Sequence, residues 1–148
     1  MARAKLSIDF DAFNVYQKKL DEIGGNATKR AVDSALKASQ KIIANKVNAA
    51  MSTHNKTGEV KETIITDLPV EWTGDTASVP VGFKIAYNGE LQGLPSIFLM
   101  YGTQLHGQPH ITPDRNLYNA IYGAAARKET RKKQEEAFEK VLERVMKK

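Results

Sequence analysis

The chain of 148 residues contains no cysteine, which excludes disulfide bonds. It also lacks any apolar run of the length that a membrane-spanning helix needs. The opening residues, MARAKLSIDFDAF, contain no apolar stretch of the length found in signal peptides. We therefore expect a soluble protein that is neither secreted nor in contact with a membrane.

Recognised motifs for catalysis or nucleotide binding are absent as well. No serine lies in a Gly-x-Ser-x-Gly elbow, and the glycines follow neither the phosphate-binding loop nor the dinucleotide pattern. The carboxylate pairs Asp9/Asp11 and Glu135/Glu136 fall at a helix start and on a charged helix face, where capping and solubility explain them. We expect no catalytic residue and no cofactor; a small enzyme with an unrecognised site remains an alternative.

The three histidines do not form a metal-binding pattern. His106 and His110 have the spacing of two ligands on one helix face, but the intervening Gly-Gln-Pro is incompatible with a helix. No carboxylate lies between Glu90 and Asp114, and His54 belongs to another loop. We therefore expect that the protein binds no metal.

The net charge of +5 is concentrated near the C-terminal end. From Arg127 to Lys148 there are nine Lys or Arg and five Asp or Glu, so the remaining residues are nearly neutral. Basic and acidic residues are interleaved at helical spacing, as in Glu129 with Lys133, which is typical of a solvated helix face. A nucleic-acid-binding module that uses this basic segment is an alternative of a different class.

The N-terminal third predicts a short strand and two helices. Alternation over Lys5–Phe10 favours a strand, and an apolar face follows on a helix that ends at Gly24 and Gly25. A second helix is predicted from a cap at Asn26 or Thr28 to about Met51. The residues expected to face inward are Phe13, Tyr16, Leu20 and Ile23 in the first helix and Val32, Leu36, Ile43 and Val47 in the second.

The middle third predicts a hairpin followed by a loop. Two alternating apolar segments, ending at Trp72 and beginning at Ala77, flank the turn sequence Thr-Gly-Asp-Thr. Because Pro80 has no N–H, we expect its strand to lie at an edge or to carry a bulge. The segment Lys84–Ser96 has no periodicity, so we predict a mobile loop that includes Gly89, Gly93 and Pro95.

The last third predicts one long helix. Periodicity leaves Ile97–Thr103 open between a buried strand and a helical turn. Thr112, followed by Pro113 and Asp114, predicts a helix start, and the helix is expected to run toward the end of the chain. Its later apolar residues, which we expect to form an exposed stripe on a projecting helix over residues 127–148, are Phe138, Val141, Leu142 and Val145. The alternative is a bend, either near Gly123 or within the charged segment, that returns the end of the helix to its own domain.

Together these elements predict a single α+β domain over residues 1–148. N-terminal helices and a long C-terminal helix are expected to pack on a small, largely antiparallel sheet.

The order of four short motifs resembles a family of tailed-bacteriophage proteins, the minor tail components also described as neck, head-tail joining or tail-completion proteins. The matching positions are Thr57–Gly58, Val81–Gly82, Tyr101–Gly102–Thr103 and Gln108–Pro109–His110. The chain departs from the family pattern at Met100, where an acidic residue is common, and at His110, where an aromatic residue is common.

The resemblance implies a structural virion protein that forms a ring at the head-tail junction and is assembled in the cytoplasm of the bacterial host. Its implied partners are copies of itself, with six expected in the ring, and neighbouring head-completion, tail-terminator or tail-tube proteins. Weak contact with packaged DNA is a further expectation, and a tail-terminator role is the nearest alternative. The residues expected at a subunit or partner interface are Tyr101, Gly102, Thr103, Gln108, Pro109, His110, Phe138, Val141, Leu142 and Val145.

Overall fold

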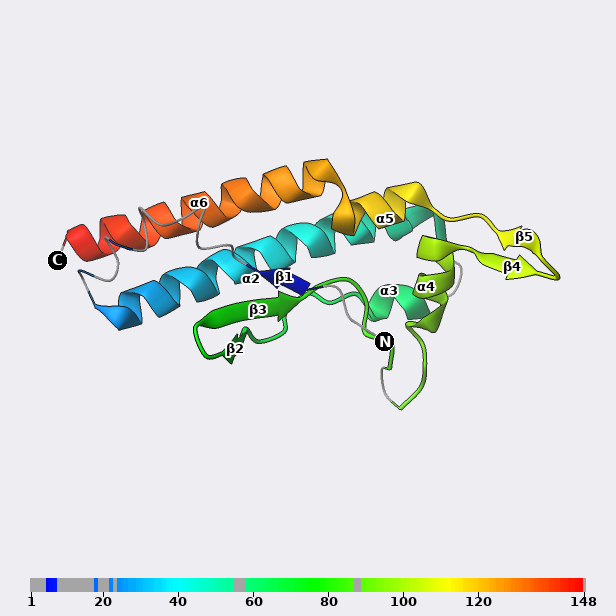
Figure 1. Cartoon of the computed structure of the whole chain (residues 1–148), viewed down its shortest axis with the longest axis horizontal. Coiled ribbons are helices and arrows are strands. Elements are labelled where there is room, and N and C mark those ends of the chain that lie inside the picture. The colour runs from blue at the N-terminus through cyan, green and yellow to red at the C-terminus, as the bar shows by residue number, and fades with distance from the viewer. Residues whose placement is uncertain are drawn as a thin grey trace.

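The computed structural model describes residues 5–7, 18, 22, 24–54, 58–86 and 89–147. Most of the first predicted helix, with Phe13, Tyr16, Leu20 and Ile23, lies outside these residues, and so does Thr57 of the Thr-Gly step. In the described part of the chain, two long helices lie side by side, a small sheet packs beside them, and a separate hairpin extends from one end of this elongated body (Figure 1).

The body is built on two helices that lie side by side, α2 (Gly25–Ala50) and α6 (Ala124–Met146) (Figure 1). Alanines at 31 and 35 on α2 and at 137 on α6 are buried between the helices, where their small side chains let the two backbones approach closely. The second predicted helix is thus confirmed, and its four predicted inward residues are all buried. Its N-cap is Gly24 rather than Asn26 or Thr28.

A three-stranded antiparallel sheet packs on α2. It consists of β1 (Lys5–Ser7), β2 (Glu71–Thr73) and β3 (Thr76–Pro80), in the order β1-β3-β2. The predicted hairpin turn is confirmed, because Thr73 pairs with Thr76 across Gly74 and Asp75. Ala77 and Val79 share one hydrophobic core with Val32, Leu36 and Phe138, so the α+β class is as predicted.

The prediction that Pro80 marks an edge strand or a bulge is wrong. Its strand, β3, is the central strand of the sheet, and Pro80 is its last residue, in register with Lys5. The missing N–H is tolerated there because β2 pairs with β3 only as far as Ser78, so no strand lies beside Pro80 on that side to need its N–H. The Pro80 carbonyl oxygen accepts from Nε2 of the buried Gln40 at 2.8 Å.

A second core lies at the other end of α2. Short elements meet there: the 3-10 turn η2 (Met51–His54), α3 (Glu59–Glu62), α4 (Leu94–Tyr101) and α5 (Arg115–Tyr122). Their buried residues include Met51, Met100 and Leu117. The ambiguous segment from Ile97 to Thr103 is therefore helical up to Tyr101.

The irregular segment predicted over Lys84–Ser96 ends earlier than expected, and its mobility stays a prediction. Gly93 is the N-cap of α4 and Pro95 lies in its first turn, so both belong to a helix start rather than to an irregular loop. Proline is suited to this position because the first turn needs no N–H donor. Gly89 lies before this helix, in a turn.

The C-terminal segment does not project as predicted. The cap of α5 is Asp114 rather than Thr112, and the chain bends at Gly123, whose ψ of 156° ends the helix before α6 begins. The expected exposed stripe is wrong for Phe138 and Leu142, which are 1% and 8% exposed in the core against α2. Burial of these side chains favours the return of α6 onto its own domain.

Candidate interaction surface

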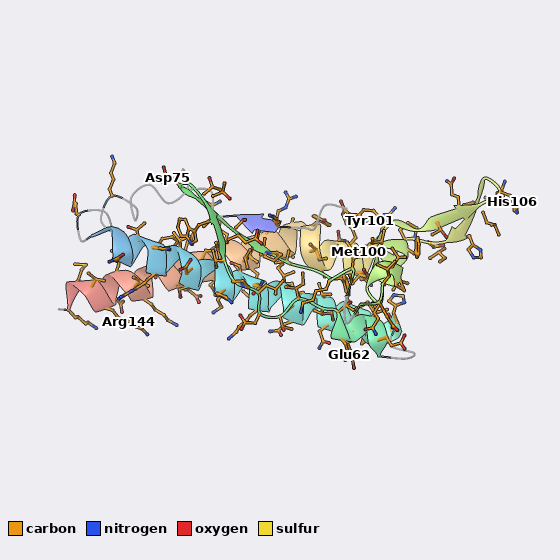
Figure 2. All side chains as sticks on the ribbon, turned by 90° about the horizontal axis from the view of Figure 1, so that it is seen from below. Glu62, Asp75, Met100, Tyr101, His106 and Arg144 are labelled. Atoms are coloured by element: carbon orange, nitrogen blue, oxygen red, sulfur yellow. The ribbon has the colours of Figure 1, made fainter. Side chains whose placement is uncertain are left out.

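A two-stranded hairpin extends from the end of the body (Figure 1). We call it the arm: β4 (Thr103–Leu105) and β5 (Gln108–Ile111), joined by His106 and Gly107. Both turn residues have positive φ, 52° and 76°, as a type I′ turn requires. His106 lies at the tip, at the opposite end of the molecule from Arg144 (Figure 2).

The register of the arm leaves one strand edge open. Leu105 pairs with Gln108 directly beside the two-residue turn, which makes them the hydrogen-bonded pair, so the backbone groups of Gln104 and Pro109 point outward. Pro109 offers no N–H on the outer edge of β5. On the outer edge of β4, Gln104 presents both an N–H and a carbonyl oxygen.

The arm gains little from packing on its own body. Every residue from Gln104 to His110 is exposed, including Leu105, whose exposed fraction is 54%. A single hairpin without a hydrophobic face is only marginally stable in water. Contact with another surface would therefore supply the burial that the arm lacks.

The arm and the segments that flank it in the sequence also lack charge. From Leu91 to Pro113 the sequence contains no Asp, Glu, Lys or Arg, although the whole chain carries +5. Soluble proteins normally protect exposed strand edges with charged side chains, because an unprotected edge pairs with other chains. The arm therefore has the properties of a contact surface.

An aromatic cluster lies at the base of the arm, formed by Tyr101 of α4 with Tyr118 and Tyr122 of α5. The rings of Tyr101 and Tyr118 meet edge to face at 6.0 Å, and those of Tyr118 and Tyr122 lie 4.9 Å apart. Burial and the hydrogen bond with Tyr101 raise the pKa of Tyr122 to about 12. Tyr101 and Tyr118 remain 56% and 40% exposed, and exposed tyrosines are common anchors of protein interfaces.

The junction between α4 and the arm depends on Gly102. Its φ is 72°, and a Cβ atom there would lie 2.5 Å from the carbonyl oxygen of Ile111. Glycine is therefore required both for the backbone angle and for the close approach of the two strands. The adjacent Thr103 Oγ1 is buried and has no hydrogen-bond partner within the described part of the chain.

The structure brings six of the predicted interface residues together: Tyr101, Gly102, Thr103, Gln108, Pro109 and His110 all lie in or beside the arm. Val141 and Val145 are half-buried and line a hollow beside the start of α2, at the other end of the body. The ten residues therefore do not form one surface. Tyr118 and Tyr122 are not among the predicted interface residues, although their spacing of four residues places them on one helix face.

No metal centre forms within residues 5–7, 18, 22, 24–54, 58–86 and 89–147, where groups of three or more His, Cys, Asp or Glu side chains suited to a metal ion are absent. The helices in these ranges include none with the length and apolarity that a membrane span requires. Metal-independence itself stays a prediction.

Comparisons with known proteins found no matching family model, no similar curated protein and no similar solved structure.

Proposed function

We propose that this protein is a structural component of a tailed-bacteriophage virion, located at the head-tail junction, where copies form a ring that joins or completes the tail. The order of the sequence motifs supports this role. The observation that carries it is the arm, an uncharged and exposed element that extends from a well-packed helical body. Such an element suits a protein that works by contact with other proteins, and no reaction is part of the proposed role.

The motifs and the arm point to the same residues. Tyr101–Gly102–Thr103 forms the junction between α4 and β4, and Gln108–Pro109–His110 forms most of β5. Gly102 gives the chain its direction at the junction, and Pro109 closes the outer edge of one strand. One motif therefore sets the direction of the arm, and the other determines which of its strand edges can pair.

The role is tested by genetic complementation in a phage that encodes this chain. Loss of the gene is expected to yield separate heads and tails in electron micrographs, and the wild-type gene should restore joined particles. A variant with Gln104–His110 replaced by a short glycine-serine turn should fold but fail to restore them. The matched control replaces the Gly74–Asp75 turn of the β2–β3 hairpin and should restore joining.

Normal particles in the absence of the gene would refute the proposal. Tails of abnormal length, rather than complete tails without heads, would favour a tail-terminator role at the same junction.

A further inference from the structure

The arm and the helices at its base carry most of the exposed large apolar side chains among the residues that the structure describes. In the part of the chain that the structure describes, the exposed large apolar side chains are Leu91, Phe98, Tyr101, Leu105, Tyr118 and Met146. All but Met146 lie on α4, α5, the arm or the segment before α4. The same surface on a second copy is therefore a suitable partner for it.

We propose that two copies of the chain pair through their arms, with the outer edge of β4 of one copy antiparallel to the outer edge of β4 of the other. The open edge is self-complementary about Gln104. In a two-fold arrangement, the Gln104 N–H of each copy donates to the Gln104 carbonyl oxygen of the other. Pro109 removes the N–H that the outer edge of β5 would need, so β4 is the edge that pairs.

The charge distribution also favours a second copy of the chain as the partner of the arm. The bodies of two copies repel each other, since each chain carries +5. The arms carry no Asp, Glu, Lys or Arg, so two arms meet without like-charge repulsion, and their length holds the bodies apart (Figure 1). Pairing would also cover part of the exposed surface of Leu105 on each copy.

A two-fold contact joins copies in pairs and does not close a ring. The inference therefore goes beyond the proposed function and does not depend on it, because pairing is measured on the purified protein alone. A hexameric ring that contained such pairs would need a second, different subunit contact.

The first test is sedimentation velocity of the purified chain over about a hundredfold range of concentration. Wild type is expected to shift from monomer toward dimer. Leu105→Lys, which places a charge beside the paired edges, should weaken dimerisation about tenfold or more. Met146→Lys is the matched control, because Met146 is 75% exposed and lies on α6, and it should dimerise like wild type. A monomeric wild type, or equal behaviour of the two variants, would overturn the proposal.

The second test locates the contact, and the absence of native cysteine makes it direct. Gln104→Cys should form a disulfide-linked dimer under mild oxidation, because antiparallel pairing brings the two copies of this residue within disulfide reach. Asp75→Cys, at the exposed turn of the β2–β3 hairpin (Figure 2), should cross-link at least about tenfold more slowly. Equal cross-linking rates would show random collision and refute pairing through β4.

Discussion

His54 and Asp114 are 60 residues apart in sequence, yet His54 Nε2 lies 2.5 Å from Asp114 Oδ2. The other carboxylate oxygen, Oδ1, caps α5 by accepting from the N–H groups of Asn116 at 2.8 Å and Leu117 at 3.2 Å. One carboxylate thus fastens the 3-10 turn that follows α2 to the start of α5. The chain passes from the arm into α5 at Asp114. The His54–Asp114 pair therefore fixes the position at which the arm leaves the body.

These contacts make the folded state sensitive to acid. The hydrogen bond from His54 lowers the pKa of Asp114 below its ordinary value of 3.8, and the N–H groups of Leu117 and Asn116 lower it further, against the opposing effect of burial. A lowered pKa in the folded state stabilises the fold above the unfolded value. That contribution is lost as the pH falls through the folded pKa.

Asp114→Asn should therefore lower stability at pH 6 by about 1 kcal/mol, and the difference from wild type should shrink as the pH falls below about 4. Thermal unfolding followed by circular dichroism between pH 3 and pH 6 measures both effects. His54→Gln should lower the melting temperature at pH 6, whereas the control His106→Gln, at the exposed tip of the arm, should not. A deficit in Asp114→Asn that is as large at pH 3 as at pH 6 would show that the carboxylate charge is not the cause.

Gln40 connects α2 to two segments of backbone. Its side chain is fully buried, donates to the Pro80 carbonyl oxygen at 2.8 Å and accepts from the Leu68 N–H at 3.1 Å. Gln40→Met keeps the length of the side chain but leaves both backbone groups without a partner. We expect a loss of about 2–4 kcal/mol in the free energy of unfolding, measured in urea.

Gln134→Met is the comparison variant, in which one hydrogen bond is lost instead of two. The Gln134 side chain donates a single bond, to Ser39 Oγ at 3.0 Å. It should cost less than Gln40→Met, and only Gln40→Met should speed hydrogen exchange at the Leu68 amide. Equal losses in the two variants would contradict the bridging role of Gln40.

The parts of the fold that the sequence predicts are those with a local signal. Helix α2 follows from apolar residues at helical spacing, such as Val32, Leu36 and Ile43, and the β2–β3 hairpin follows from a Gly-Asp turn between alternating segments. The arm carries no such signal. Its strands bury neither face, so no apolar alternation marks them, and Pro109 further argues against a strand.

Long-range packing is the part that the sequence could not supply. The break at Gly123 is a single residue between two helical segments, and composition alone does not show that the second segment lies along α2. Burial of Phe138 depends on alanines that are about a hundred residues away along the chain.

A substitution at Phe138 tests directly whether α6 packs on its own domain. Its side chain is 1% exposed in the core that includes Ala31, Ala35 and Leu36. Phe138→Ala should lower the free energy of unfolding by about 3–5 kcal/mol, because it leaves a cavity in this core. Met146→Ala on the same helix should change it by about 0.5 kcal/mol or less. A small effect of Phe138→Ala on the isolated protein would instead support the original hypothesis that this residue docks on a partner.

Gly93 is required for steric reasons at the start of α4. A Cβ atom there would lie 1.8 Å from the Lys84 carbonyl oxygen, so alanine cannot be accommodated without separating two segments of backbone. The same approach lets the Gly93 N–H donate to the Ile85 carbonyl oxygen at 3.1 Å, and the Gly93 carbonyl oxygen accepts from Ser96 Oγ at 2.6 Å. Gly93→Ala should therefore lower the melting temperature and speed hydrogen exchange in the first turn of α4, at a cost of about 2 kcal/mol.

Gly25→Ala is the control, because no atom lies within 4 Å of the added Cβ at the first residue of α2, and alanine favours the helix there. If the two variants melted at the same temperature, the segment before α4 would not be held against Gly93, and the originally predicted loop through Pro95 would describe it better.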